Sequence, residues 1–130
     1  MANREEIQKY AFASDGDASD VANLSIARYA VNGASSTTYG YTSSGKVSSN
    51  TNIIDKFTFA SDADATDVGD MATTTRGGGG SSSLTYGYRH GGSTPNIDTI
   101  EKWSFAAGTQ NAADVANLAS SQEHLAGTQY

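Results

Sequence analysis

The sequence predicts an all-β protein made of about three repeats, each with four short strands. Similar seven-residue segments begin at Ile7, Ile54 and Ile100, so their starts are 54 − 7 = 47 and 100 − 54 = 46 residues apart. Each segment alternates two sets of side chains over a β-prone run, which is typical of a half-buried strand. A fixed period of this length indicates a repeat architecture, in which one unit cannot bury its apolar face alone.

Composition sets broad limits on the class of protein. The chain has 130 residues, a length typical of one domain, and a net charge of −6 at pH 7. This acidic balance argues against a nucleic-acid backbone or an anionic membrane as the partner. The chain has no cysteine, so we expect no disulfide and no thiol chemistry. The N-terminus lacks an apolar core segment and no apolar run approaches about 20 residues, so we expect no signal peptide and no transmembrane segment.

The four predicted strands of a repeat follow one another in a constant order. An aromatic strand comes first, at 7–13, 54–60 and 100–106, and its aromatic pair is expected in the core. After an acidic turn, a short outer strand follows near Val21, Val68 and Val115. A third strand is expected at 27–34 and within the Gly- and Thr-rich run 73–83. The last strand contains Tyr-Gly-Tyr, at 37–41 and 84–88. A helix is considered only over 112–121.

This order of features resembles the kelch repeat, whose period is about 50 residues. Gly91-Gly92 follows Tyr86-Gly87-Tyr88, where the kelch double glycine falls, whereas the first repeat has Gly45 alone. Asp-Val dipeptides stand where kelch repeats usually carry tryptophan. The run 55–70, followed by Thr-Tyr-Gly-Tyr, is similar to repeat proteins in phages of aquatic bacteria. The resemblance spans about residues 6–130 and implies kelch-like β-propeller blades.

The predicted blades are too few to close a ring, because propellers typically have four to eight. The chain begins in mid-blade at 7–13 and ends in mid-blade at 128–130, so two halves would add up to one blade. We therefore expect one domain over 1–130, with repeats at about 7–53, 54–99 and 100–130, whose copies join head to tail. Two chains would give about six blades. The alternative is an incomplete part of a larger protein, or an open stack held by another partner.

No motif in the chain predicts catalysis. The acidic turns 15–20 and 62–67 lack the glutamate that ends a calcium loop, and the third repeat loses two of their three acids, so we expect solvated turns and no metal. His90 and His124 are the only histidines, and neither has metal-ligand spacing. The glycines at 77–80 lack the Lys-Ser/Thr of a phosphate loop, which favours a bend or a flexible loop. We expect no enzyme activity and no cofactor.

The candidate ligand-binding residues are Tyr39, Tyr41, Tyr86, Tyr88 and Arg89. Aromatic rings beside Ser, Thr and Arg suit sugar stacking, and core packing is the alternative reading of the same residues. The predicted function is a structural or adhesive component of a phage virion, as a head decoration or tail-associated protein that assembles through shared blades. A carbohydrate-binding, lectin-like propeller is the alternative. Expected partners are further copies of the chain, other virion proteins or surface glycans, in the virion or in the host cytoplasm before lysis.

Overall fold

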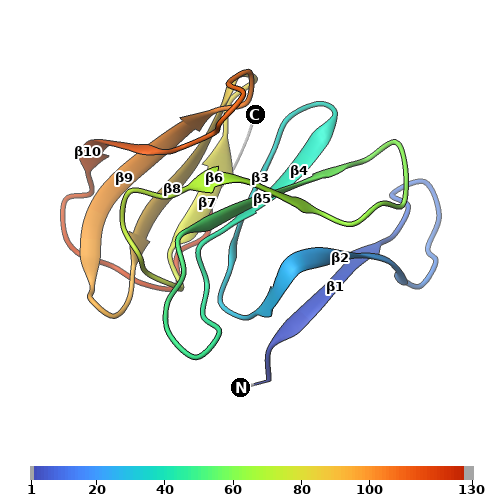
Figure 1. Cartoon of the computed structure of the whole chain (residues 1–130), viewed down its shortest axis with the longest axis horizontal. Coiled ribbons are helices and arrows are strands. Elements are labelled where there is room, and N and C mark those ends of the chain that lie inside the picture. The colour runs from blue at the N-terminus through green and yellow to red at the C-terminus, as the bar shows by residue number, and fades with distance from the viewer. Residues whose placement is uncertain (1, 128–130) are drawn as a thin grey trace.

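The computed structural model describes residues 2–127, which form ten β-strands and no helix (Figure 1). The strands, in chain order, are β1 (Arg4–Lys9), β2 (Ser19–Arg28), β3 (Asn32–Ser35), β4 (Tyr39–Ser43), β5 (Ile53–Thr58), β6 (Thr66–Asp70), β7 (Gly79–Ser82), β8 (Tyr86–Gly92), β9 (Ile97–Ser104) and β10 (Ala113–Asn117). The predicted all-β class is confirmed. No helix that could cross a bilayer occurs in the described part of the chain.

The strands form three antiparallel sheets. Strands β1 and β2 make a two-stranded hairpin sheet, β3 to β6 make the middle sheet, and β7 to β10 make the C-terminal sheet. In both four-stranded sheets each strand pairs with the next along the chain, which is the simplest antiparallel topology. Each of these sheets therefore takes two strands from one sequence repeat and two from the next.

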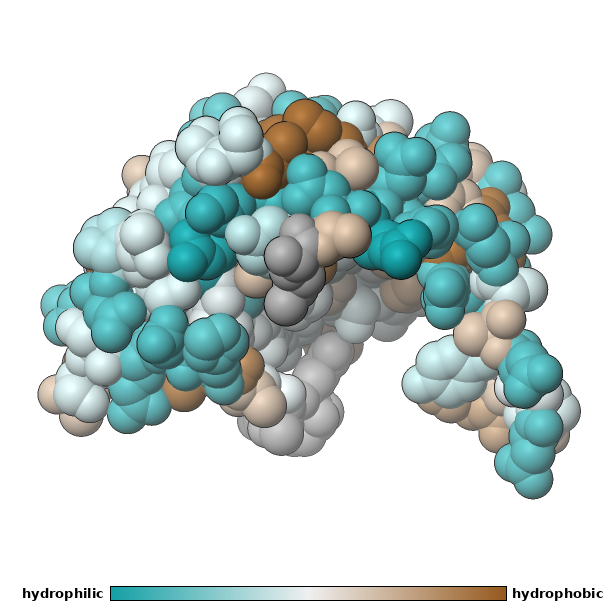
Figure 2. Space-filling view, turned by 90° about the horizontal axis from the view of Figure 1, so that it is seen from below, coloured by the Kyte–Doolittle hydropathy of each residue, from teal (hydrophilic) through white to brown (hydrophobic). Residues whose placement is uncertain are grey.

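The sheets stand side by side in chain order, and Figure 2 shows an arch that is hollowed on one side. The first strands of the two larger sheets, β3 and β7, lie against one another near the centre of Figure 1. Strand β1 is the counterpart of β5 and β9, because it pairs with β2 as β5 pairs with β6 and β9 with β10. The predicted aromatic strand 7–13 needs correction, since β1 ends at Lys9 and Tyr10 and Phe12 lie beyond its end. In residues 2–127, β1 pairs only with β2, whereas β5 and β9 each have a strand on both sides.

The core lies between the middle and C-terminal sheets. Tyr41, Ile54, Met71 and Trp103 are buried together. The ring of Tyr41 stacks on Phe105 with centroids 4.6 Å apart and meets Trp103 edge-on at 6.2 Å. Burying a large apolar side chain contributes about 1.5–3 kcal/mol, so this small cluster stabilises the contact between the two sheets.

Three further sequence predictions about local structure need correction. The run 27–34 is not one strand, because the chain turns at Ala30, which has a φ of 56°, between β2 and β3. The alanine-rich run 112–121 is not a helix, since β10 pairs with β9 there. The glycines 77–80 are only partly a bend: Gly77 has a φ of 65°, but Gly79 and Gly80 belong to β7. The predicted end at 128–130 lies outside the described residues.

Candidate functional site

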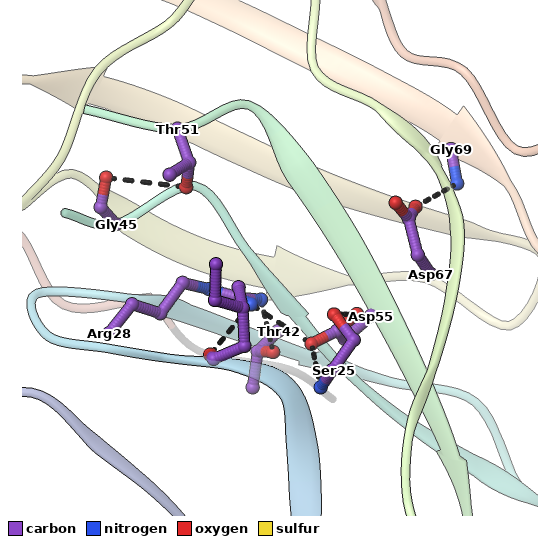
Figure 3. A network of polar contacts seen from close by, with 9 residues as sticks. Ser25, Arg28, Thr42, Gly45, Thr51, Asp55, Asp67 and Gly69 are labelled. Carbon is purple, nitrogen blue, oxygen red and sulfur yellow. Dashed lines mark hydrogen bonds and ion pairs between the residues drawn. The ribbon is translucent and has the colours of Figure 1, made fainter. Parts of the chain in front are cut away.

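A buried carboxylate joins the hairpin sheet to the middle sheet. Asp55 of β5 accepts hydrogen bonds from the backbone N–H of Ser25 at 3.0 Å and from its hydroxyl at 2.6 Å (Figure 3). The Arg28 guanidinium lies 2.9 Å from the same carboxylate and donates to the Thr42 hydroxyl at 3.1 Å. The side chains of Arg28 and Asp55 are fully buried. A buried charge requires an opposite charge and hydrogen-bond partners, and Asp55 has both here.

The same contact recurs between the middle and C-terminal sheets. Glu101 of β9 accepts a hydrogen bond from the backbone N–H of Ala72 at 2.9 Å and pairs with Arg89 at 2.5 Å. Both of these charged side chains are fully buried. Burial lowers the pKa of Arg89, and the charge of Glu101 acts in the opposite direction. The chain therefore has a carboxylate that reaches across a sheet boundary at two equivalent places.

The arginine that neutralises the carboxylate comes from different strands in the two places. In the middle sheet, Arg28 pairs with Asp55 and donates a hydrogen bond to Thr42. In the next repeat, the equivalent positions 28 + 47 = 75 and 42 + 47 = 89 hold threonine and arginine. The exchange keeps one arginine and one threonine at each place. Sequence reasoning missed this site, although a comparison of these positions between repeats contained the signal.

Two further hydrogen bonds are repeated at both sheet boundaries. A backbone N–H of one sheet donates to a side-chain oxygen in the turn of the next sheet, at 2.9 Å in both cases: Asn23 to Asp64, and Asp70 to Asn111. The backbone carbonyl of Asn23 also accepts a hydrogen bond from the Ala65 N–H at 2.8 Å. The carbonyl of Asp70 accepts one from the Ala112 N–H at the same distance. The turns that follow β5 and β9 thus contribute to the contact between sheets.

Glycines allow the innermost strands to approach closely. A Cβ atom on Gly80 of β7 would lie 1.9 Å from the carbonyl oxygen of Gly33, and one on Gly127 would lie 1.7 Å from that of Gly80. These residues follow the repeat, since 80 − 33 = 47 and 127 − 80 = 47. A glycine in a strand often marks such a close backbone approach.

A second glycine position makes room for the aromatic strands. A Cβ atom on Gly40 or on Gly87 would lie 2.3 Å from the ring of the cross-strand partner, Phe57 or Trp103. These glycines therefore let an aromatic ring cover the neighbouring strand. The hairpin sheet has no such strand beside β1 in the described residues, and its Tyr10 is 60% exposed.

The five candidate binding residues do not lie on one surface. Tyr41 and Arg89 are buried, in the core and in the ion pair with Glu101. Tyr39 is exposed and carries the Lys56 ammonium 4.8 Å above its ring, and half-buried Tyr86 has the same contact with Lys102 at 4.6 Å. Tyr88 is half-buried. Among the five candidate residues, Tyr39 and Tyr86 occupy equivalent positions in two repeats and are both accessible.

The expected absence of a metal and of a cofactor remains a sequence-based prediction. Within residues 2–127, no three His, Cys, Asp or Glu side chains form a group that could hold a metal ion. In the acidic turn 62–67, Asp62 forms an ion pair with Lys9 at 2.5 Å, and Asp64 accepts a hydrogen bond from the backbone N–H of Asn23.

Compared with known proteins, the chain matches no family model and no curated protein.

One titratable group predicts a pH dependence of stability. Burial and the neighbouring Arg89 charge lower the pKa of His90 below its ordinary value. Below about pH 6.5, the His90 side chain binds a proton more readily in the unfolded chain than in the folded chain. The stability of the fold therefore decreases as the pH falls from there toward the lower pKa of His90 in the folded protein. We expect His90→Gln to flatten the fall in melting temperature between pH 7.5 and 5.5. The matched change His124→Gln, at an exposed histidine, should leave the slope unchanged; equal slopes in the wild type and in His90→Gln would contradict this assignment.

Proposed function

We propose that the chain is a non-enzymatic structural module whose sheets are kelch-like propeller blades and whose copies assemble by sharing a blade. The observation that carries the proposal is the hairpin sheet, which corresponds to the outer two strands of a four-stranded sheet. Its strand β1 has one neighbour in the described residues, and an open strand edge is a template for another chain. Tyr10 and Phe12, which are 60% and 95% exposed, follow the end of β1 in the chain.

The wider setting of the proposal is a phage virion, as a head decoration or tail-associated component. Its support is the resemblance of the sequence around 55–70 and the Thr-Tyr-Gly-Tyr segments to phage repeat proteins. A decoration or tail component has to present the same contact many times, and a chain whose ends complement each other suits that requirement.

The mass of the protein in solution tests the assembly. We expect light scattering behind a sizing column to give the mass of two or more chains at micromolar concentration, falling toward one chain on dilution. A folded chain that stays monomeric over this range would overturn the proposal. Circular dichroism on the same samples separates a folded monomer from an unfolded one, and an unfolded lone chain would also count against assembly from copies of itself.

A carbohydrate-binding propeller is the second candidate, and a shallow hollow between the two larger sheets favours it. Tyr39, Leu84 and Phe105 contribute apolar surface to this hollow, and Ser36 and Thr38 contribute hydroxyl groups. Rings with hydroxyl groups beside them suit sugar stacking. This function predicts glycan-array binding that Tyr39→Ala abolishes, whereas an assembly module should be indifferent to sugars.

A further inference from the structure

We infer that a second copy docks through the same hydrogen bonds that join neighbouring sheets within one chain. The inference rests on the proposed assembly and names its contact. One side is the N-terminal face, made of Gln8, Asp17, Ala18 and Gly33. The other side is the C-terminal face, made of Asn117, Ala119 and Gly127. All seven residues are exposed, and each stands one repeat away from residues that make a contact inside the chain.

The turn contact gives the first two predicted hydrogen bonds. Asn23 and Asp70 each use their backbone N–H and C=O toward the next sheet, and the third position is 70 + 47 = 117, again an asparagine. On the other side, Asp64 and Ala65 have their counterparts at 64 − 47 = 17 and 65 − 47 = 18, where the same two residue types recur. The Asn117 N–H of one copy therefore donates to the Asp17 carboxylate of the other. The Ala18 N–H donates to the Asn117 carbonyl.

The buried carboxylate gives the third hydrogen bond. The backbone N–H groups of Ser25 and Ala72 donate to the carboxylates of Asp55 and Glu101, respectively. One repeat after Ala72, the equivalent donor is the backbone N–H of residue 72 + 47 = 119, an alanine. One repeat before Asp55, the equivalent acceptor position is 55 − 47 = 8, which is a glutamine. The amide oxygen of Gln8 can accept the Ala119 N–H without placing a charge in the contact. The contact between copies thus needs no arginine partner.

The glycine series gives the steric part of the contact. Gly80 lies against the carbonyl of Gly33, and Gly127 lies against that of Gly80. A Cβ atom on Gly33 would meet no heavy atom within 4 Å, so the place on that side is open. A second copy that follows the repeat puts the carbonyl of its Gly127 there. The contact joins two different faces, so it propagates head to tail until rotation closes a ring.

One substitution tests the steric part of the contact without touching the lone chain. Gly33→Ala should leave the circular dichroism spectrum and melting temperature of the dilute chain unchanged and abolish assembly, because the methyl group fills the space that the second copy needs. The matched control Gly108→Ala, also with nothing within 4 Å, should assemble normally. Normal assembly of Gly33→Ala would overturn the contact.

A charge substitution tests the polar part. Asp17→Lys should weaken assembly by at least about tenfold, since it removes a hydrogen bond to a charged group. Asp17→Asn should assemble normally, because Asn111 makes this contact for Asp70 inside the chain. Asp67→Lys carries the same charge change outside the contact and should also assemble. Equal effects of Asp17→Lys and Asp67→Lys would count against the predicted register.

Cross-linking separates failure of the contact from failure of the proposed function. The chain has no cysteine, so a mixture of Ala18→Cys and Asn117→Cys proteins should give a disulfide-linked pair of chains. The double variant Asn23→Cys with Ala65→Cys, its internal equivalent, should form the disulfide within one chain. A mixture of Ala18→Cys and Leu84→Cys should not link. Assembly of the wild type without the 18–117 link would overturn this inference alone, whereas a strictly monomeric wild type would overturn the proposed function as well.

Discussion

Replacing Arg28 with threonine is expected to lower the free energy of unfolding by about 3–5 kcal/mol, because it leaves the buried Asp55 carboxylate without its counter-ion. Both side chains are fully buried, so solvent cannot replace the lost partner. Urea unfolding at neutral pH measures the change. The exposed pair of Lys9 and Asp62 is the control, since Lys9→Ala should cost less than about 1 kcal/mol.

The arrangement in the C-terminal sheet predicts how this loss can be repaired. There the arginine stands on the strand beside the carboxylate, as Arg89 does for Glu101. Adding Thr42→Arg and Asp55→Glu to Arg28→Thr reproduces that arrangement in the middle sheet. We expect the triple variant to recover most of the lost stability. A triple variant no more stable than Arg28→Thr would show that the two ion pairs are not interchangeable.

Replacing Gly80 with alanine is expected to cost at least about 3 kcal/mol, because the new methyl group would overlap the backbone of the neighbouring strand. Its Cβ atom would lie 1.9 Å from the Gly33 carbonyl oxygen, and a backbone atom cannot move aside by a rotamer change. Gly33→Ala is the matched control and should change stability by less than about 1 kcal/mol in the dilute chain. Thermal unfolding of both variants below the assembly concentration measures the difference. Similar melting temperatures would contradict the close packing of β3 and β7.

The strands that follow the repeat were predictable from the sequence, while their exact limits were not. The aromatic strands at 54–60 and 100–106 correspond to β5 and β9, because their alternation continues throughout the paired region. The Tyr-Gly-Tyr segments start their strands two residues later than predicted. In the middle sheet the Ser36 hydroxyl accepts from the backbone N–H groups of Thr38 and Tyr39, which holds the preceding residues in a turn. Such a turn competes with strand pairing and is not visible in the alternation.

The contacts between sheets could not be predicted from local patterns. Arg28 and Asp55 are 55 − 28 = 27 residues apart, and only the folded chain brings them together. The aromatic residues were expected in the core as a class, yet equivalent positions differ in burial: Trp103 is 2% exposed, whereas its counterpart in the first repeat, Tyr10, is 60% exposed. The reason is that Trp103 lies over Gly87 of the neighbouring strand β8 and packs against Tyr41 of the middle sheet, while β1 has no strand on its open side in the described residues. The repeat is therefore a guide to equivalent positions but not to their burial.

Amide hydrogen exchange in the wild-type protein tests the central claim most directly. The Ala65 and Ala112 N–H groups should be protected at every concentration, because their bonds lie within one chain. If copies dock by the same rule, the Ala18 and Ala119 N–H groups should be unprotected in the dilute chain and reach similar protection in the assembled protein. Exchange at these two amides that does not slow as the protein assembles would contradict the account.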